Sequence, residues 1–100
     1  MSHLLIVQPS ALEDAWEAAF YLEHREPALG GRFLDELERC YQYIRDFPSG
    51  FQQRRGGFRH APVAKFPYRV VYEIDGGTIM SIKCAIPAAS PASASGPNPF

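Results

Sequence analysis

Several features that mark common classes of protein are missing from this 100-residue sequence. No apolar run approaches the roughly 18 residues that a membrane-spanning helix requires, and the run near the N-terminus, Leu4 to Val7, has only four. No basic region precedes that run, as it would in a signal peptide. These absences predict a cytoplasmic protein that carries no targeting segment and does not contact a membrane.

Cysteine and metal-binding patterns are equally scarce. The two cysteines, Cys40 and Cys84, lie in separate apolar patterns, which favours two buried thiols and leaves a single disulfide as the alternative. There is no phosphate-binding glycine loop, no zinc-ligand spacing and no serine or cysteine beside a histidine in a known catalytic motif. We therefore predict no metal ion and no cofactor.

Neither sign of charge dominates the chain, because the formal net charge is −1. A generally basic nucleic-acid-binding protein is therefore not indicated. The two halves differ, however: residues 1–50 hold four arginines and nine acids, whereas residues 51–100 hold six basic residues and two acids. One face could dock a polyanion or an acidic partner while another face repels it.

The first half of the chain has helical periodicity. A short apolar strand, His3 to Gln8, precedes Ser10, which is a candidate N-cap with Glu13 completing a capping box. Pro27 prevents the first helix from continuing. The predicted apolar stripe of this helix contains Leu12, Ala15, Trp16, Ala19 and Phe20, and its acids Glu13, Asp14 and Glu17 form a solvated back. A second helix over 31–46 would complete a hairpin and bury Phe33, Leu37, Cys40, Tyr41 and Ile44.

The second half alternates with a period of two, as strands do. The turn "DGG" separates two predicted core faces, one with Tyr68, Val70, Tyr72 and Ile74 and one with Met80, Ile82, Cys84 and Ile86. Arg69, Val71, Glu73, Ser81 and Lys83 are expected on the opposite face. The segment from Phe58 to Val63 is an expected edge strand, because Pro62 cannot donate a ladder hydrogen bond.

These elements predict one α+β domain over residues 1–87, in the order β-α-α-β-β-β. A helical hairpin would pack on a small, mostly antiparallel sheet, and the first strand could pair in either direction. Residues 88–100 are rich in alanine, serine and proline, so we expect a flexible tail.

Positive charge is concentrated among aromatic residues between Arg54 and Arg69. The basic side chains of this segment are Arg54, Arg55, Arg59, His60, Lys65 and Arg69, and its aromatic residues include Phe58, Phe66 and Tyr68. Such a cluster could neutralise phosphates and stack on unpaired bases. A solvated edge hairpin and a docking surface for an acidic protein are the alternatives.

The order of four motifs resembles the ParE/RelE superfamily of toxins from type II toxin-antitoxin pairs. The motifs are "ALEDAWEAAFYL" (11–22), "GRFLDELER" (31–39), "FP" (47–48) and "FRHAPVAKFPYRVVYEI" (58–74). The resemblance covers about residues 3–87, and "FPYRVVYEI" is its most specific part. It implies a cognate antitoxin whose flexible C-terminal segment wraps the toxin and neutralises it.

The resemblance leaves the activity open, since one fold can carry several functions. RelE-like members cleave messenger RNA on the ribosome, whereas ParE-like members act against DNA gyrase. Arg69 matches the sheet arginine that RelE-like nucleases place against the scissile phosphate. Their paired lysines fall near His60 and Pro62, and their C-terminal histidine and arginine positions fall on Pro87 and on Ala89 or Ser90.

This departure from the nuclease pattern favours a ParE-like toxin that inhibits DNA gyrase by binding, with no confident catalytic residue. One alternative is a metal-independent, ribosome-dependent mRNA endoribonuclease with a reduced site of Arg69, His60, Lys65 and Arg59. The other is a non-toxic protein of the same fold that still binds an antitoxin. The residues that contact the partners are not assigned by the sequence.

Overall fold

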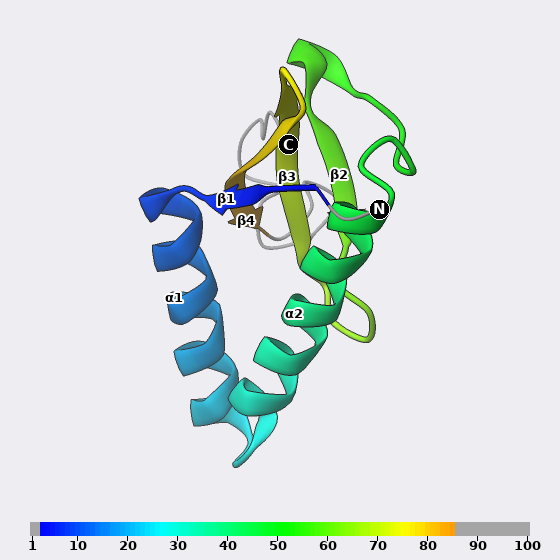
Figure 1. The fold of residues 1–100 in the computed structure, drawn as a ribbon. Coiled ribbons are helices and arrows are strands. Elements are labelled where there is room, and N and C mark those ends of the chain that lie inside the picture. Colours follow the sequence, from blue (N-terminus) through cyan, green and yellow to red (C-terminus); the bar gives the residue numbers. More distant parts are fainter. Residues whose placement is uncertain (1–2, 86–100) are drawn as a thin grey trace.

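The computed structural model describes residues 3–85, and it confirms the predicted α+β class with a helical hairpin beside a mostly antiparallel sheet (Figure 1). The predicted tail, 88–100, and Ile86 lie outside the described residues. In chain order the elements are β1 (Leu5–Val7), α1 (Pro9–Arg25), α2 (Leu29–Asp46), a 3₁₀ turn (Arg55–Gly57), β2 (Arg59–Pro62), β3 (Arg69–Asp75) and β4 (Thr78–Ala85).

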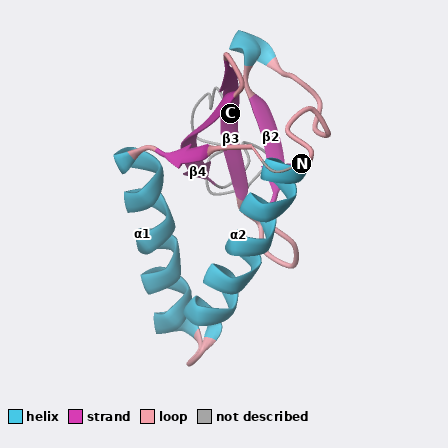
Figure 2. Ribbon diagram, viewed as in Figure 1, coloured by secondary structure: helices cyan, strands magenta, loops and turns pink. Residues whose placement is uncertain are grey.

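The four strands form one sheet in the order β1-β4-β3-β2 (Figure 2). β2 and β4 each pair antiparallel with β3, and β2 lies at an edge as predicted. β1 pairs parallel with β4, placing Leu5 opposite Ile79 and Val7 opposite Ser81. The backbone N–H of His3 donates to the Arg45 carbonyl over 3.0 Å, so the segment that leads into β1 is also fastened to the end of α2.

The turn between β3 and β4 has the two-residue form that a right-twisted hairpin favours. Gly76 and Gly77 both have positive φ, 57° and 91°. Residues other than glycine, asparagine and aspartate rarely adopt positive φ at two successive positions. The "DGG" prediction is therefore confirmed at the level of backbone geometry.

A β-bulge in β4 overturns the predicted alternation of that strand. Val71 pairs with Lys83 but Tyr72 pairs with Ser81, so Ile82 is an extra residue in the ladder. Because one inserted residue reverses the face of every residue beyond it, Ile79 and Ser81 face the core together with Cys84. The expectation that Met80 and Ile82 are core residues and that Ser81 lies opposite is wrong.

β3 follows its predicted pattern more closely. Tyr68, which precedes the strand, and Val70 and Tyr72 are buried in the core. Ile74, near the turn, is 38% exposed, so the core ends before it. The hydroxyl of Tyr72 donates to the Pro48 carbonyl over 2.7 Å, which fastens the segment after α2 to the sheet.

α2 buries the face that its sequence predicts. Phe33, Leu37, Cys40, Tyr41 and Ile44 are all buried in the core cluster. The centroid of the Phe33 ring lies 5.4 Å from that of Phe66 and 5.0 Å from that of Tyr68, so this helix residue packs against two aromatic residues of the segment between β2 and β3. The helix begins two residues earlier than predicted, at Leu29.

α1 buries only the two alanines of its predicted stripe, Ala15 and Ala19. Its buried residues are Ala11, Ala15, Ala18, Ala19 and Leu22. Leu12, Trp16 and Phe20 are 51%, 50% and 64% exposed, so the three largest members of the predicted stripe lie outside the core. The short alanine side chains instead allow the backbone of α1 to approach β4 and α2 closely.

The predicted capping box is also wrong, because the first turn of α1 serves the sheet instead. The helix begins at Pro9, one residue before the predicted cap, and no side chain caps it. The Ser10 hydroxyl donates to the Ile82 carbonyl over 3.1 Å, and Asp14 accepts the Cys84 N–H over 3.2 Å. These side chains satisfy backbone hydrogen-bonding groups of β4 that lie beyond the end of β1. Asp14 is therefore not part of the solvated back that was predicted for this helix.

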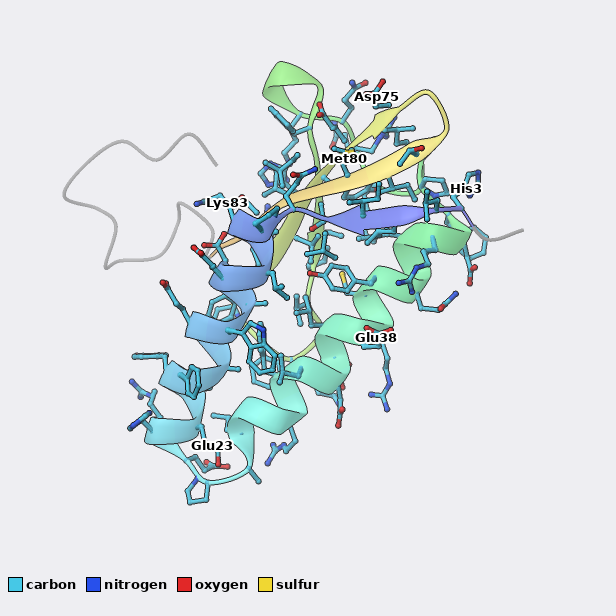
Figure 3. All side chains as sticks on the ribbon, turned by 60° about the vertical axis from the view of Figure 1, so that its left-hand side comes forward. His3, Glu23, Glu38, Asp75, Met80 and Lys83 are labelled. Atoms are coloured by element: carbon cyan, nitrogen blue, oxygen red, sulfur yellow. The ribbon has the colours of Figure 1, made fainter. Side chains whose placement is uncertain are left out.

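The tip of the hairpin is held by a carboxylate and a glycine. Glu23 accepts hydrogen bonds from the backbone N–H groups of Ala28, 2.8 Å, and Gly30, 2.9 Å, which satisfies donors at the start of α2 (Figure 3). These backbone hydrogen bonds lower the pKa of Glu23 below its ordinary value. A Cβ at Gly30 would lie 2.5 Å from the Ala19 carbonyl oxygen, so this helix crossing requires glycine.

Candidate binding surfaces

Two of the four predicted nuclease residues lie together on the face of the sheet that the helices do not cover. His60 pairs with Val71, and Arg69 pairs with Pro62, so the two basic residues are diagonal neighbours on adjacent strands. His60 is buried and Arg69 is half-buried. Burial, followed by the charges of Arg54 and Arg69, lowers the pKa of His60 below its ordinary value of 6.5. The imidazole is therefore mostly neutral at pH 7.

The other two predicted nuclease residues point elsewhere. The Arg59 guanidinium donates to the Phe51 carbonyl, which fastens the segment after α2 to β2. The Lys65 ammonium lies 3.6 Å from the Glu36 carboxylate of α2 and is 79% exposed. Lys65 has a φ of 71°, in the left-handed region that residues other than glycine rarely adopt. The structure does not bring Arg59 and Lys65 to His60 and Arg69.

Arg54 and Lys83 accompany His60 and Arg69 instead. Lys83 lies opposite Val71 on the same face, and its ammonium is 3.9 Å from the Asp14 carboxylate at the start of α1 (Figure 3). We call Arg54, His60, Arg69 and Lys83 the basic face. Alternation placed Lys83 on the face of Arg69, and the sequence cluster contained Arg54. Strand register, which alternation does not give, places His60 and Lys83 on either side of Val71.

The basic face is suited to hold an anionic group. RNA cleavage by a 2′-hydroxyl group needs one group to accept a proton and another to donate one, besides cations on the phosphate. The basic face thus supplies cationic side chains and one candidate base, His60.

An apolar groove lies between α2 and the edge of the sheet. It is a hollow of about 320 Å³ lined by Glu36, Arg39, Cys40, Tyr43, Phe51, Pro62 and Ala64. A second hollow, of about 310 Å³, shares Glu36 and Arg39, extends along α2 to Arg32 and Leu29, and is also lined by Lys65 from the loop after β2. We call the two hollows the α2 groove. It has an apolar end beside Tyr43 and a charged end of mixed sign.

The cysteine in this groove is not poised for chemistry. Burial raises the pKa of Cys40 to about 12, so its thiol stays protonated at neutral pH. The thiol points at the Pro62 carbonyl, 3.7 Å away. Cys84 is likewise a free buried thiol, so the prediction of two buried thiols is confirmed. Within residues 3–85 no cluster of three or more histidine, cysteine or acidic residues could hold a metal ion.

Three large apolar residues on α1 make a further candidate surface. Leu12, Trp16 and Phe20 recur every four residues, which places them in one row along the helix, and each is at least half exposed. We call this row the α1 stripe. The sequence contained the row but assigned it to the core. A neighbouring row of alanines in the same helix could have indicated that the smaller side chains form the buried side. No helix of residues 3–85 combines the length and apolarity that crossing a bilayer demands.

Comparison with known proteins defines the family. The model of the ParE toxin of the type II toxin-antitoxin system parDE matches residues 5–83. This chain therefore belongs to the ParE toxin family, and it has the RelE/ParE-like fold. The matched span includes every helix and strand except the last residues of β4.

Solved structures support the fold at low sequence identity. A chain of the chromosomal ParDE toxin-antitoxin system from P. aeruginosa is similar with a TM-score of 0.77 and 10% identity, covering 85% of this chain and 96% of that one. A chain of the RelBE2 toxin-antitoxin complex from Mycobacterium tuberculosis has a TM-score of 0.58 and 18% identity, covering 87% and 100%. No curated protein sequence matches the chain.

Proposed function

We propose that this ParE-family toxin acts by binding DNA gyrase and that an antitoxin neutralises it by covering its exposed surfaces. The family is the toxin half of a two-protein system, and the two solved structures described above come from toxin-antitoxin systems. The chain also offers two surfaces for a partner, the α2 groove and the α1 stripe.

One observation separates binding from catalysis most directly. Arg59 and Lys65 are engaged with Phe51 and Glu36, away from Arg69 and His60. Two of the four residues of the reduced nuclease site thus make their contacts away from the other two, which supports action by binding. Action by binding requires no acid and no base, so it agrees with this arrangement better than RNA cleavage does.

The test compares two activities of one preparation. Purified protein is added to a gyrase supercoiling assay and, in parallel, to translating ribosomes with an mRNA of known sequence. We expect supercoiling to be inhibited and the transcript to stay intact. Supercoiling that continues at toxin concentrations that arrest growth would contradict the proposal.

Arg69→Ala is the matched variant for both assays. Arg69 is half-buried on the helix-free face, so its removal leaves the core cluster intact. We expect growth arrest and gyrase inhibition to persist in this variant. Loss of toxicity from a protein that still folds would indicate that the basic face takes part.

Ribosome-dependent mRNA cleavage is the second candidate, and the neutral His60 beside Arg69 is the observation that favours it. It predicts cut transcripts with the wild-type chain, and their loss in both Arg69→Ala and His60→Ala. Lys65→Ala is the control that should still cut, since Lys65 lies at α2. A chain that binds an antitoxin but neither arrests growth nor acts in either assay would be the non-toxic alternative.

A further inference from the structure

The basic face carries its side chains on three adjacent strands of the sheet. Arg69 on β3 has Pro62 and Ala85 as its ladder partners. His60 and Lys83 each lie two residues from those partners, so Arg69 is a diagonal neighbour of both, and diagonal neighbours are about 7–8 Å apart. Backbone pairing therefore fixes three basic residues in a row across the strands.

The two arginines of the basic face keep their charge for a ligand. Arg54 is exposed and Arg69 is half-buried. Within residues 3–85 neither guanidinium takes part in an ion pair with an acid. Lys83 shares its charge with Asp14, 3.9 Å away, so we expect a smaller contribution from it.

The acids of the molecule lie away from Arg69 and Lys83. Asp75 is at the turn between β3 and β4, at the opposite end of this hairpin from Lys83 (Figure 3), and Glu73 is two residues before Asp75. The nine acids of residues 1–50 all lie on α1, on α2 or between them. This distribution attracts a polyanion to the end of the sheet that holds Arg69 and Lys83, and it repels a polyanion from the turn and the helices.

The aromatic residues of the basic segment do not share the face of its charges. Phe66 and Tyr68 pack against Phe33 of α2, on the core side. Phe58, which is half-buried, is the one other aromatic residue of the sequence 54–69. Proteins that bind single-stranded nucleic acid stack successive bases on several exposed rings. The basic face offers charge without such a series of rings, which suits the backbone of a duplex better than unpaired bases.

We propose that the basic face binds the phosphate backbone of duplex DNA through Arg54, Arg69 and Lys83, without reading the base sequence. The choice of DNA rests on the proposed function, because gyrase acts on duplex DNA. A duplex carries about one negative charge per 1.7 Å of its axis, so a row of cations across three strands meets phosphates in any register. The contact adds to the binding of gyrase and does not replace it, so inhibition by Arg69→Ala persists.

The salt dependence of DNA binding counts these contacts. A short fluorescein-labelled duplex is titrated with the purified chain at several salt concentrations, and binding is followed by fluorescence anisotropy. Three phosphate contacts predict a slope of about −2.7 in a plot of log K against log salt concentration. Each of Arg54→Ala, Arg69→Ala and Lys83→Ala should make the slope shallower by about 1. The absence of binding, or a slope that the triple variant retains, would overturn the inference.

Lys65→Ala is the matched control for DNA binding. Lys65 belongs to the same basic segment and is 79% exposed, but its ammonium lies 3.6 Å from Glu36 of α2. We expect the affinity and the slope of the wild type. A loss equal to that of Arg69→Ala would show that positive charge anywhere on the chain suffices, and would overturn the assignment to the basic face. Circular dichroism confirms that each variant is folded, and Arg54→Ala changes only an exposed side chain.

Three further probes identify the anion that the basic face prefers. They are a duplex RNA and a single-stranded DNA of the same sequence, and poly-glutamate, which represents an acidic protein. We expect the DNA duplex to bind tighter than the single strand and than poly-glutamate of equal charge, and at least as tightly as the RNA duplex. Tighter binding of any of the three would overturn the choice of duplex DNA.

The gyrase assay separates this inference from the proposed function. If the chain inhibits supercoiling and binds no DNA by itself, the inference is overturned and gyrase inhibition stands. If the chain binds DNA with the expected slope while supercoiling continues, the basic face stands as a DNA-binding site and gyrase is refuted as the target.

Discussion

α1 and α2 have nearly the same length and meet in one hairpin, yet they use their large apolar residues in opposite ways. α2 places Phe33, Leu37 and Ile44 inside the core, whereas α1 places alanines inside and leaves Trp16 and Phe20 exposed. α2 therefore supplies volume to the core. α1 supplies a close-fitting cover on one side and exposes its large apolar residues on the other.

This difference shows that helical periodicity identifies a row of apolar residues but does not tell whether that row is buried or exposed. Both helices carry a row of large apolar residues at helical spacing, and in α1 a row of alanines lies beside it. The close contact of Gly30 with Ala19 shows why the small row is inside, because the helices approach too closely there for larger side chains. Substitutions in the two helices should therefore differ widely in cost.

The largest effect is expected in α2. Phe33→Ala removes a fully buried ring that contacts both Phe66 and Tyr68, and it should lower the free energy of unfolding by about 3–5 kcal/mol. Urea unfolding followed by circular dichroism measures this change. A loss below about 1 kcal/mol, within the range of ordinary surface substitutions, would contradict the role of α2 as the source of core volume.

The next effect is expected where the helices touch. Gly30→Ala forces a Cβ to within 2.5 Å of the Ala19 carbonyl, and overpacking of this kind costs about 1–3 kcal/mol. Gly31→Ala is the matched control, because a Cβ there meets nothing within 4 Å. Alanine is the better helix former, so thermal unfolding should show the control equal to or more stable than the wild type. Equal melting temperatures for the two variants would refute the close crossing.

A smaller, pH-dependent effect is expected at Glu23. Its folded-state pKa is lowered below the ordinary value of 4.5, so its contribution to stability is present above that pH and is lost as pH falls through the lowered pKa. Glu23→Gln replaces one of the two carboxylate oxygens with an N–H₂ group, which cannot accept a hydrogen bond from the Ala28 or Gly30 N–H.

Melting curves recorded from neutral to acidic pH measure the contribution of Glu23. The variant should melt lower than the wild type at neutral pH, and the two curves should converge as the wild-type carboxylate becomes protonated. A difference in melting temperature that stays constant across this range would show that the charge of Glu23 does not stabilise the hairpin.

The smallest effect on stability is expected on the outer side of α1. Phe20→Ala removes the same ring as Phe33→Ala, but from a position that is 64% exposed. The free energy of unfolding should change by no more than about 0.5 kcal/mol, as for most surface substitutions. If urea unfolding gives a loss comparable to that of Phe33→Ala, the contrast between the helices is wrong.

The sequence predicted best the elements in which one periodicity holds without interruption. The buried face of α2 is correct at all five residues, and β3 is correct from Tyr68 to Tyr72. β4 fails at one inserted residue, Ile82, because a bulge exchanges the faces of a strand without altering its composition. The predicted cap of α1 is wrong because of a tertiary contact: the Ser10 hydroxyl donates to a carbonyl of β4, more than seventy residues away in the sequence.

The candidate nuclease residues were predicted only in part for a similar reason. Strand pairing brings His60 and Arg69 together, and alternation could foresee the position of Arg69. Arg59 and Lys65 have long side chains whose direction depends on the Phe51 carbonyl and on Glu36, both distant in the sequence. Local spacing contains no information about these partners.

The parallel pairing of β1 with β4 sets the timing of folding during translation. β1 is the first strand to leave the ribosome and pairs with the last strand of the described chain, so its inner edge has no ladder partner until β4 has been made. Contacts of such large sequence separation form late, because the long intervening chain must first be closed into a loop. A nascent chain of this protein therefore cannot complete its sheet before β4 has been translated. A partner that is already present would meet the nascent chain before that sheet is complete.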